Sequence, residues 1–192
     1  MIQDMSSVDI LASWLQDESR FEKELSNVYK IWLEYLNPYW SENPWSRALE
    51  GKKVLVVHPF VDSIQKQYKK RAFLHKHPQT LPDFDLKTIK AVQGIGGVCN
   101  EGFKDWFDAF EYMKAEINKS NYDICILGCG AYGFPLAAHV KRMGKKAIHM
   151  GGATQMLFGI KGKRWEDEYG EFMNEHWIRP SKEETPINAM KI

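Results

Sequence analysis

Residues 122–134, YDICILGCGAYGF, decide the fold class of this chain. The first six residues form a short apolar run that is typical of a buried β-strand. Gly128, Gly130 and Gly133 follow as a G-x-G-x-x-G motif, which predicts a tight turn into a helix over residues 134–143. A strand, a glycine-rich turn and a helix in this order form the repeating unit of parallel α/β domains.

The same alternation extends from this unit in both directions. Strands are expected over residues 54–57, 84–92 and 146–150, and helices from Asp62 onward and over residues 103–117. The short connections imply right-handed crossovers. The sequence therefore predicts an α/β fold, a Rossmann-like, mostly parallel sheet of about four or five strands flanked by helices, within residues 51–180.

The two ends of the chain differ from this domain. Residues 1–50 predict an N-terminal helical extension, with helices near 7–15 and 21–36 and a packed aromatic connection after them. The polar residues 181–192 predict an irregular tail. The extension also contains four tryptophans: Trp14, Trp32, Trp40 and Trp45. A further hypothesis is that its aromatic helices pack on a partner or on a second copy of the chain.

Composition excludes several classes of protein. Among 192 residues, 26 Lys and Arg balance 25 Asp and Glu, and the net charge of +1 lacks the basic footprint of a nucleic-acid binder. The longest uncharged apolar stretches are far shorter than the roughly 20 residues of a membrane span. Three cysteines, an odd number without metal spacing, argue against a disulfide framework. Together with an acidic N-terminus unlike a signal peptide, these features predict a cytoplasmic protein.

The glycine motif is the strongest candidate for a ligand site. Gly128, Gly130 and Gly133 let the backbone approach a phosphate, and the following helix offers unpaired N–H groups and a partial positive charge. Tyr132 belongs to the same loop. Two alternatives stand beside this interpretation: the glycines serve only close packing of helix and strand, or Cys129 is a nucleophile activated by the helix N-terminus.

The segment after the strand at 146–150 is the second candidate, because open α/β sheets bind ligands at the carboxyl ends of their strands. A dinucleotide site would place an acidic residue about 20 residues after the glycine motif, and this region has a histidine instead. That difference counts against NAD and S-adenosylmethionine. The residues here that can contact hydroxyl or phosphate groups are His149, Gly151, Gly152, Thr154, Gln155, Lys161 and Arg164.

The end of the first strand is the third candidate. His58 lies where a parallel sheet presents polar groups to its ligand crevice, and Ser63 and Gln65 lie in the first turn of the next helix, where an anion can bind. Asp62 is expected to cap that helix. The sequence has no G-x-S-x-G elbow, H-E-x-x-H helix or P-loop lysine, and it identifies no catalytic residue.

Three stretches carry a resemblance to a known family: VLVVHPFVDSIQKQYKKR, DLKTIKAVQGIGG and YDICILGCGAYGFPLAAHVKRMGKKAIHMGGATQMLFGIKGKRW. They resemble a family of uncharacterised bacterial proteins encoded among capsule and surface-polysaccharide genes. That family is in turn similar to glycosyltransferases of the D-type fold. Its members begin before the equivalent of Met1 and run past Ile192, so the resemblance implies a truncated chain.

The resemblance implies a glycosyltransferase-like protein that uses a nucleotide sugar as donor and a glycan or a lipid-linked acceptor. It also implies a divalent metal, Mn²⁺ or Mg²⁺, bridging the diphosphate. The acidic Asp-x-Glu metal motif of D-type enzymes is absent from this chain. Two further hypotheses stay open: a Rossmann domain for S-adenosylmethionine or NAD, and a non-catalytic interaction module.

Overall fold

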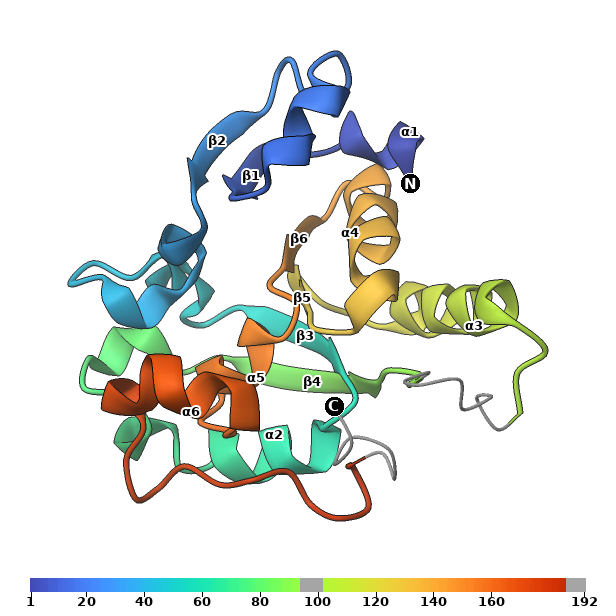
Figure 1. Cartoon of the computed structure of the whole chain (residues 1–192). Coiled ribbons are helices and arrows are strands. Elements are labelled where there is room, and N and C mark those ends of the chain that lie inside the picture. The colour runs from blue at the N-terminus through green and yellow to red at the C-terminus, as the bar shows by residue number, and fades with distance from the viewer. Residues whose placement is uncertain (94–101, 186–192) are drawn as a thin grey trace.

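The computed structural model describes residues 1–93 and 102–185, and its centre is a four-stranded parallel sheet (Figure 1). The strands lie in the order β4 (Asp85–Lys90), β3 (Lys53–His58), β5 (Ile124–Leu127) and β6 (Lys146–His149). Val56 at the middle of β3 lies opposite Thr88 of β4 and Ile126 of β5. The predicted α/β fold and its parallel sheet are confirmed.

The strand order contains a topological switch point. After β3 the chain adds β4 on one side, then crosses back to add β5 and β6 on the other side. Two connections therefore leave in opposite directions from the carboxyl ends of β3 and β5. In open parallel sheets this is the place where ligands bind.

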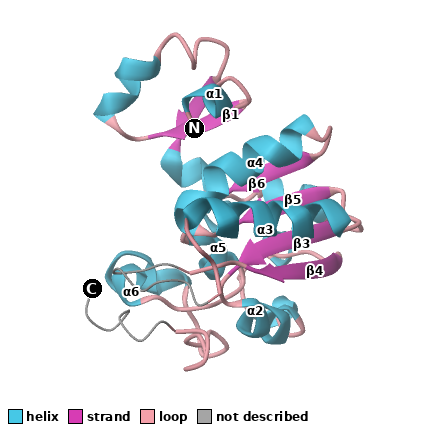
Figure 2. Cartoon of the chain, turned by 90° about the vertical axis from the view of Figure 1, so that its right-hand side faces the viewer, coloured by secondary structure: helices cyan, strands magenta, loops and turns pink. Residues whose placement is uncertain are grey.

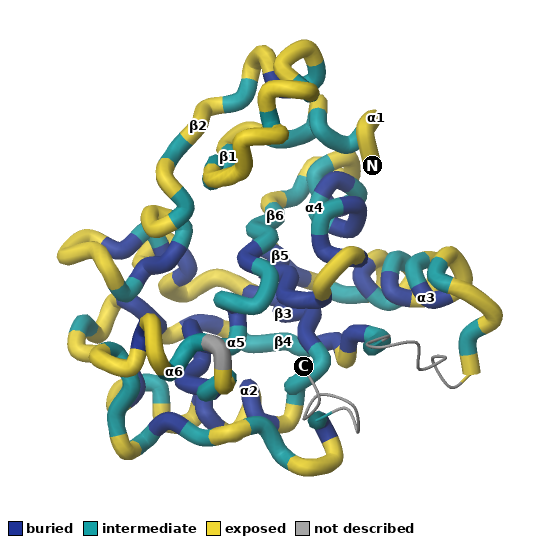
Figure 3. The backbone as a smooth tube through the Cα atoms, viewed as in Figure 1, coloured by how far each residue is buried: buried dark blue, intermediate teal, exposed yellow. Residues whose placement is uncertain are grey.

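Helices cover both faces of the sheet, because successive side chains of each strand point to opposite sides. Val56 and Ile126 pack in one core with α2 (Val61–Tyr68) and α5 (Ala153–Leu157). Val57 and Leu127 pack in the other core with α3 (Trp106–Lys119) and α4 (Gly133–Arg142), which lie together on their face of the sheet (Figure 2). All four residues of β5 and every residue of β3 except Lys53 are accordingly buried (Figure 3).

The remaining elements are short. α6 (Lys163–Tyr169) follows α5, and Ile160 forms an isolated parallel bridge with Ile178. The 3₁₀ turns are η1 (Gln16–Phe21), η2 (Leu33–Leu36), η3 (Pro38–Trp40), η4 (Trp45–Leu49), η5 (Arg71–Phe73), η6 (Pro78–Thr80), η7 (Gly130–Tyr132) and η8 (Gly170–Phe172). None of the helices in the described ranges has the length and apolar character that crossing a membrane requires.

The N-terminal extension departs from the prediction of two amphipathic helices. It has one short helix, α1 (Ile2–Met5), and a separate pair of parallel strands, β1 (Ile10–Ser13) and β2 (Tyr29–Trp32). The expected helices near 7–15 and 21–36 are therefore wrong. A short isolated helix is marginal unless a packed face stabilises it, and the β-formers of β2 find a partner strand instead.

The connection between the extension and the sheet is ordered, as expected. Tyr39 and Trp40 pack against Tyr169 and Phe172, and Leu49 reaches the core. At the other end of the chain, the described part of the tail continues to Thr185 without helix or strand and passes beside α2 (Figure 1). The rest of the expected tail, 186–192, lies outside the described residues.

Candidate functional site

The carboxyl ends of β3 and β5 bring the first and third sequence candidates together. His58 ends β3, and Gly128 follows β5 at the neighbouring position. A Cβ atom on Gly128 would lie 2.5 Å from Cδ2 of His58 and 2.6 Å from Cβ of Thr154. The first glycine of the motif therefore makes room for a histidine and a threonine that fill the crevice.

His58 is held as a neutral imidazole. Its side chain is 2% exposed, and Nδ1 accepts a hydrogen bond from the backbone N–H of Phe60 at 3.0 Å. Burial lowers the pKa of His58 to about 3, because the charged form would lose its hydration. His58 consequently brings no positive charge to a ligand at neutral pH.

The last glycine of the motif has the same kind of partner. A Cβ on Gly133 would lie 2.2 Å from Cε1 of His149, at the end of β6. Nδ1 of His149 lies 3.2 Å from the carbonyl oxygen of Leu127, and burial lowers the pKa of this histidine too. For Gly128 and Gly133, close packing explains the glycine without a ligand.

The middle glycine is different. Gly130 has a φ of +57°, is exposed, and would carry its Cβ into open space with no atom within 4 Å. The positive φ explains why glycine is preferred here, since other L-residues are strained in this region. The open space beside it, next to the start of α4, is where the motif can still approach a ligand.

The other side chains of the loop are built into the core. Tyr132 is buried and its ring stacks on Trp106, with centroids 4.9 Å apart. Cys129 is buried as well, and burial raises the pKa of its thiol to about 12. Burial and the raised pKa disfavour Cys129 as a nucleophile, because the thiolate is the reactive form.

An anion occupies the first turn of α2, and it belongs to the chain itself. The carboxylate of Glu184, which is 4% exposed, accepts hydrogen bonds from the backbone N–H of Asp62 at 2.8 Å and from that of Ser63 at 3.2 Å. The Ser63 hydroxyl donates to the same carboxylate. The expected cap, Asp62, instead lies inside the helix, and Glu184 does the capping.

Residues 181–185, which we call the strap, hold Glu184 in place. The N–H of Ser181 lies 3.4 Å from the Ser63 hydroxyl oxygen, and the Gln93 side chain donates to the carbonyl of Glu184 at 3.5 Å. Sequence reasoning missed Glu184, because it lies 121 residues from Ser63 and no local motif marks it. It was placed in a tail for which only irregular structure was expected.

Several predicted contact residues have structural partners elsewhere. Gln65 donates to the hydroxyl of Thr88 on β4 at 2.7 Å, and Gln155 donates to the carbonyl of Ile160 at 3.2 Å. Thr154 is buried and lies 3.4 Å from the carbonyl of Leu127. These three side chains stabilise the protein's own loops and strands.

Lys161 of the second candidate follows a segment that contacts the last turn of α2 rather than its first turn. Gly159, shortly before Lys161, is held by the side chain of Gln67 in the last turn of α2. Gly151 and Gly152 lead into α5, and Arg164 lies in α6, its side chain outside the described part of the structure. Over residues 1–93 and 102–185, no three or more His, Cys, Asp or Glu side chains cluster as a metal site would require.

Comparison of the chain with protein-family models, curated proteins and solved structures gives no match.

Proposed function

We propose that this chain binds a nucleotide diphosphate, as carried by a nucleotide sugar, at the carboxyl ends of β3 and β5, and serves as a glycosyltransferase-like protein. The observation that supports this most directly is the buried carboxylate of Glu184 in the first turn of α2. Its oxygens take the donors that a phosphate group would take at a helix N-terminus of a switch-point site.

The chemistry of this turn suits a phosphate. Two backbone N–H groups and the Ser63 hydroxyl converge on one anion, and the helix dipole adds a partial positive charge. The open backbone at Gly130 lies at the end of the neighbouring strand and offers space to the rest of the ligand. His58 at the end of β3 is uncharged at neutral pH, so the N–H groups supply the attraction.

The strap and the ligand compete for the same donors. Glu184 must leave the first turn of α2 before a phosphate can bind there, and the strap is held by few hydrogen bonds besides those of its carboxylate. Only molecules with an open strap can bind the ligand. The apparent affinity is therefore lower than the intrinsic affinity of the open form.

The class of nucleotide ligand is proposed from the absence of the acidic residue that binds the ribose in dinucleotide folds. In dinucleotide folds the glycine motif follows the first strand, and an acidic residue at the end of the second strand binds the ribose. Here the motif follows β5, the third strand, and β4, the second, ends in Lys90. This arrangement disfavours NAD, while the resemblance to surface-polysaccharide proteins favours a nucleotide sugar. The proposal includes no metal ion.

The test is calorimetric titration with the diphosphates of uridine, guanosine, cytidine and thymidine, with and without Mn²⁺. Glu184→Ala should bind the preferred nucleotide about tenfold more tightly than the wild type, because the competing carboxylate is gone. Glu183→Ala is the matched control: its side chain is exposed next in the chain, and the variant should bind like the wild type.

Ser63→Ala should weaken binding, because it removes one of the three donors. Absence of binding in the wild type and in Glu184→Ala would refute the nucleotide proposal. Binding without release of nucleoside diphosphate from any nucleotide sugar would support the non-catalytic alternative.

A further inference from the structure

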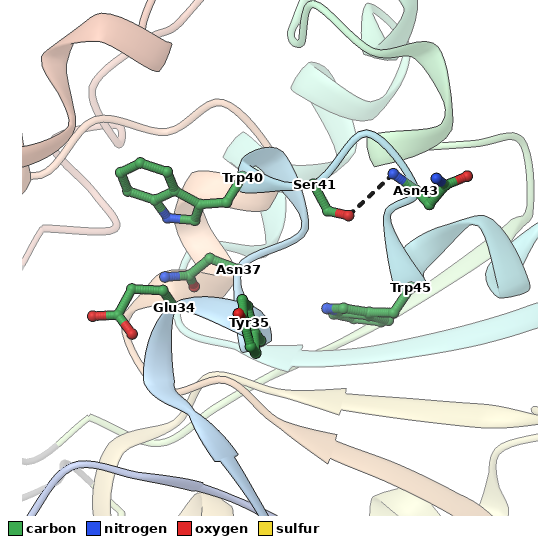
Figure 4. A pocket seen from close by; sticks show the side chains of 7 residues that line it. All are labelled: Glu34, Tyr35, Asn37, Trp40, Ser41, Asn43 and Trp45. Atoms are coloured by element: carbon green, nitrogen blue, oxygen red, sulfur yellow. Dashed lines mark hydrogen bonds between the residues drawn. The ribbon is translucent and has the colours of Figure 1, made fainter.

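A pocket lies away from the sheet, within the aromatic connection that leads from the N-terminal extension into the domain. It is open to one side and has a volume of about 440 Å³ between η2, η3 and η4 (Figure 4). That volume falls in the range of about 300–1,000 Å³ that is typical of small-molecule sites. We call it the aromatic pocket, after the rings of Tyr35, Trp40 and Trp45 that line it.

Two of these rings are fixed before any ligand binds. Nε1 of Trp45 donates to the carbonyl of Leu36 at 2.9 Å. Trp40 packs edge-on against Phe172, with ring centroids 4.6 Å apart. Even so, Trp40 keeps 45% of its surface exposed, and Tyr35 keeps 66%. The pocket therefore presents positioned aromatic surface to a ligand.

Asn37 is the polar centre of the pocket. It lies between the two tryptophans in the close view and is only 7% exposed (Figure 4). Its backbone is fixed by hydrogen bonds to Glu34 and Trp40, and its side-chain amide, which no described residue hydrogen-bonds, stays accessible from the pocket. An accessible amide offers a donor and an acceptor together, so this position suits a ligand that supplies both an acceptor and a donor.

The other polar groups of the pocket limit the class of ligand that it can bind. The Ser41 hydroxyl accepts the N–H of Asn43 at 3.0 Å, which leaves its own proton to donate. Glu34 is the one charged side chain among the residues lining the pocket, and no Lys, Arg or His lines it. Arg47 lies just behind the lining and donates to Asn43 at 3.2 Å, but the carboxylate that borders the pocket itself, that of Glu34, disfavours a phosphate or a carboxylate. The occupant therefore differs from that of the first turn of α2.

We infer that the aromatic pocket binds a neutral saccharide ring, separately from the anion site at α2. The hydroxyl groups of a sugar both donate and accept, which satisfies the amide of Asn37 and the carboxylate of Glu34 together. Its C–H faces carry partial positive charge and stack on the negative faces of indole rings. A quaternary ammonium would suit the rings but would leave the Asn37 amide unpaired.

The experiment is titration of the full chain with glucose, galactose and N-acetylglucosamine, followed by tryptophan fluorescence and by saturation-transfer NMR. At least one sugar should bind the wild type. Asn37→Ala and Trp40→Ala should each weaken that binding about tenfold, through the lost hydrogen bonds and the lost stacking surface. Trp32→Ala is the control, because Trp32 is 72% exposed and does not line the pocket.

Stability measurements separate binding from folding. Asn37→Ala removes an accessible amide that no described residue hydrogen-bonds, so its melting temperature should stay close to that of the wild type. The inference is overturned if none of the three sugars binds, if choline binds in their place, or if binding is the same in Asn37→Ala and Trp40→Ala as in the wild type. Nucleotide titrations on the same variants, expected to be unchanged, report on the α2 site alone.

Discussion

At the scale of single residues, the glycine motif combines two roles that the sequence pattern could not separate. Gly128 and Gly133 make space for the rings of His58 and His149, whereas Gly130 alone faces open space. A G-x-G-x-x-G pattern predicts the turn, but the side chains that pack against its first and last glycines lie in other segments of the chain. The sequence therefore predicted the loop correctly and left the function of each glycine open.

This division predicts unequal effects of alanine. Gly128→Ala and Gly133→Ala should each lower the free energy of unfolding by about 3 kcal/mol, because a Cβ would overlap an imidazole ring. Gly130→Ala should lose only about 1 kcal/mol, from backbone strain at positive φ. Urea unfolding measures all three. Equal losses would contradict the packing role of the outer two glycines.

His58 predicts a pH dependence of stability. Its pKa is about 3 in the folded chain against an ordinary value of 6.5, so between these limits only the unfolded chain binds the proton. Above about pH 6.5 the neutral His58 costs the folded state no stability. As the pH falls below that value, the free energy of unfolding decreases by up to about 1.4 kcal/mol per pH unit.

Urea unfolding at about pH 7 and about pH 5 compares the wild type with His58→Gln, which should lose less stability on acidification. NMR gives a direct check, since the ring protons of His58 should not titrate above about pH 5. Titration of this ring near its ordinary pKa would show that the imidazole is hydrated, contrary to the structure.

At the scale of elements, the strands of the sheet and the helices α2, α3 and α4 were predictable, whereas α5, α6 and the elements of the extension were not. β3 and β5 are short apolar runs buried on both faces, and α3 carries an apolar stripe, so their local patterns and their tertiary environments agree. Residues 29–32 also combine aliphatic and aromatic side chains, as a buried helix or strand would, but none of them is buried. Their pairing with β1 is a long-range contact that helical spacing does not reveal.

The first turn of α2 is the element in which the candidate site departs most from its sequence. Ser63 was a candidate from its position alone, and it does contact an anion. Glu184 was missed, since the first turn of a helix shows which group it can bind but not which distant residue supplies it. A double-mutant cycle of Ser63→Ala and Glu184→Ala should give a coupling of about 1 kcal/mol in urea unfolding. Additive losses would contradict a direct bond.

At the scale of the whole molecule, the N-terminal strand pair is attached to the domain by weak contacts. Arg142 pairs with Asp4 at 2.7 Å and Lys141 with Asp9 at 2.6 Å; both basic side chains are exposed, and of the two carboxylates only that of Asp4 is largely covered. Such pairs contribute about 0–1 kcal/mol each. The strands themselves have no fully buried residue, unlike β5, in which all four are buried.

Amide hydrogen exchange should therefore be much faster in β1 and β2 than in β3 and β5, because the strand pair can open without unfolding the sheet. Exchange followed by mass spectrometry on the intact protein resolves the two regions. Equal protection in both sheets would mean that the extension folds and unfolds with the domain.

The central claim is that the first turn of α2 exchanges the carboxylate of Glu184 for a phosphate of the ligand. The most direct measurement follows the backbone amide signals of Asp62, Ser63 and Gly130 by NMR while uridine diphosphate, or the nucleotide preferred in calorimetry, is added. We predict that all three signals shift and saturate together, at lower nucleotide concentration in Glu184→Ala than in the wild type. Saturable nucleotide binding that leaves the signals of Asp62 and Ser63 in place would contradict the claim.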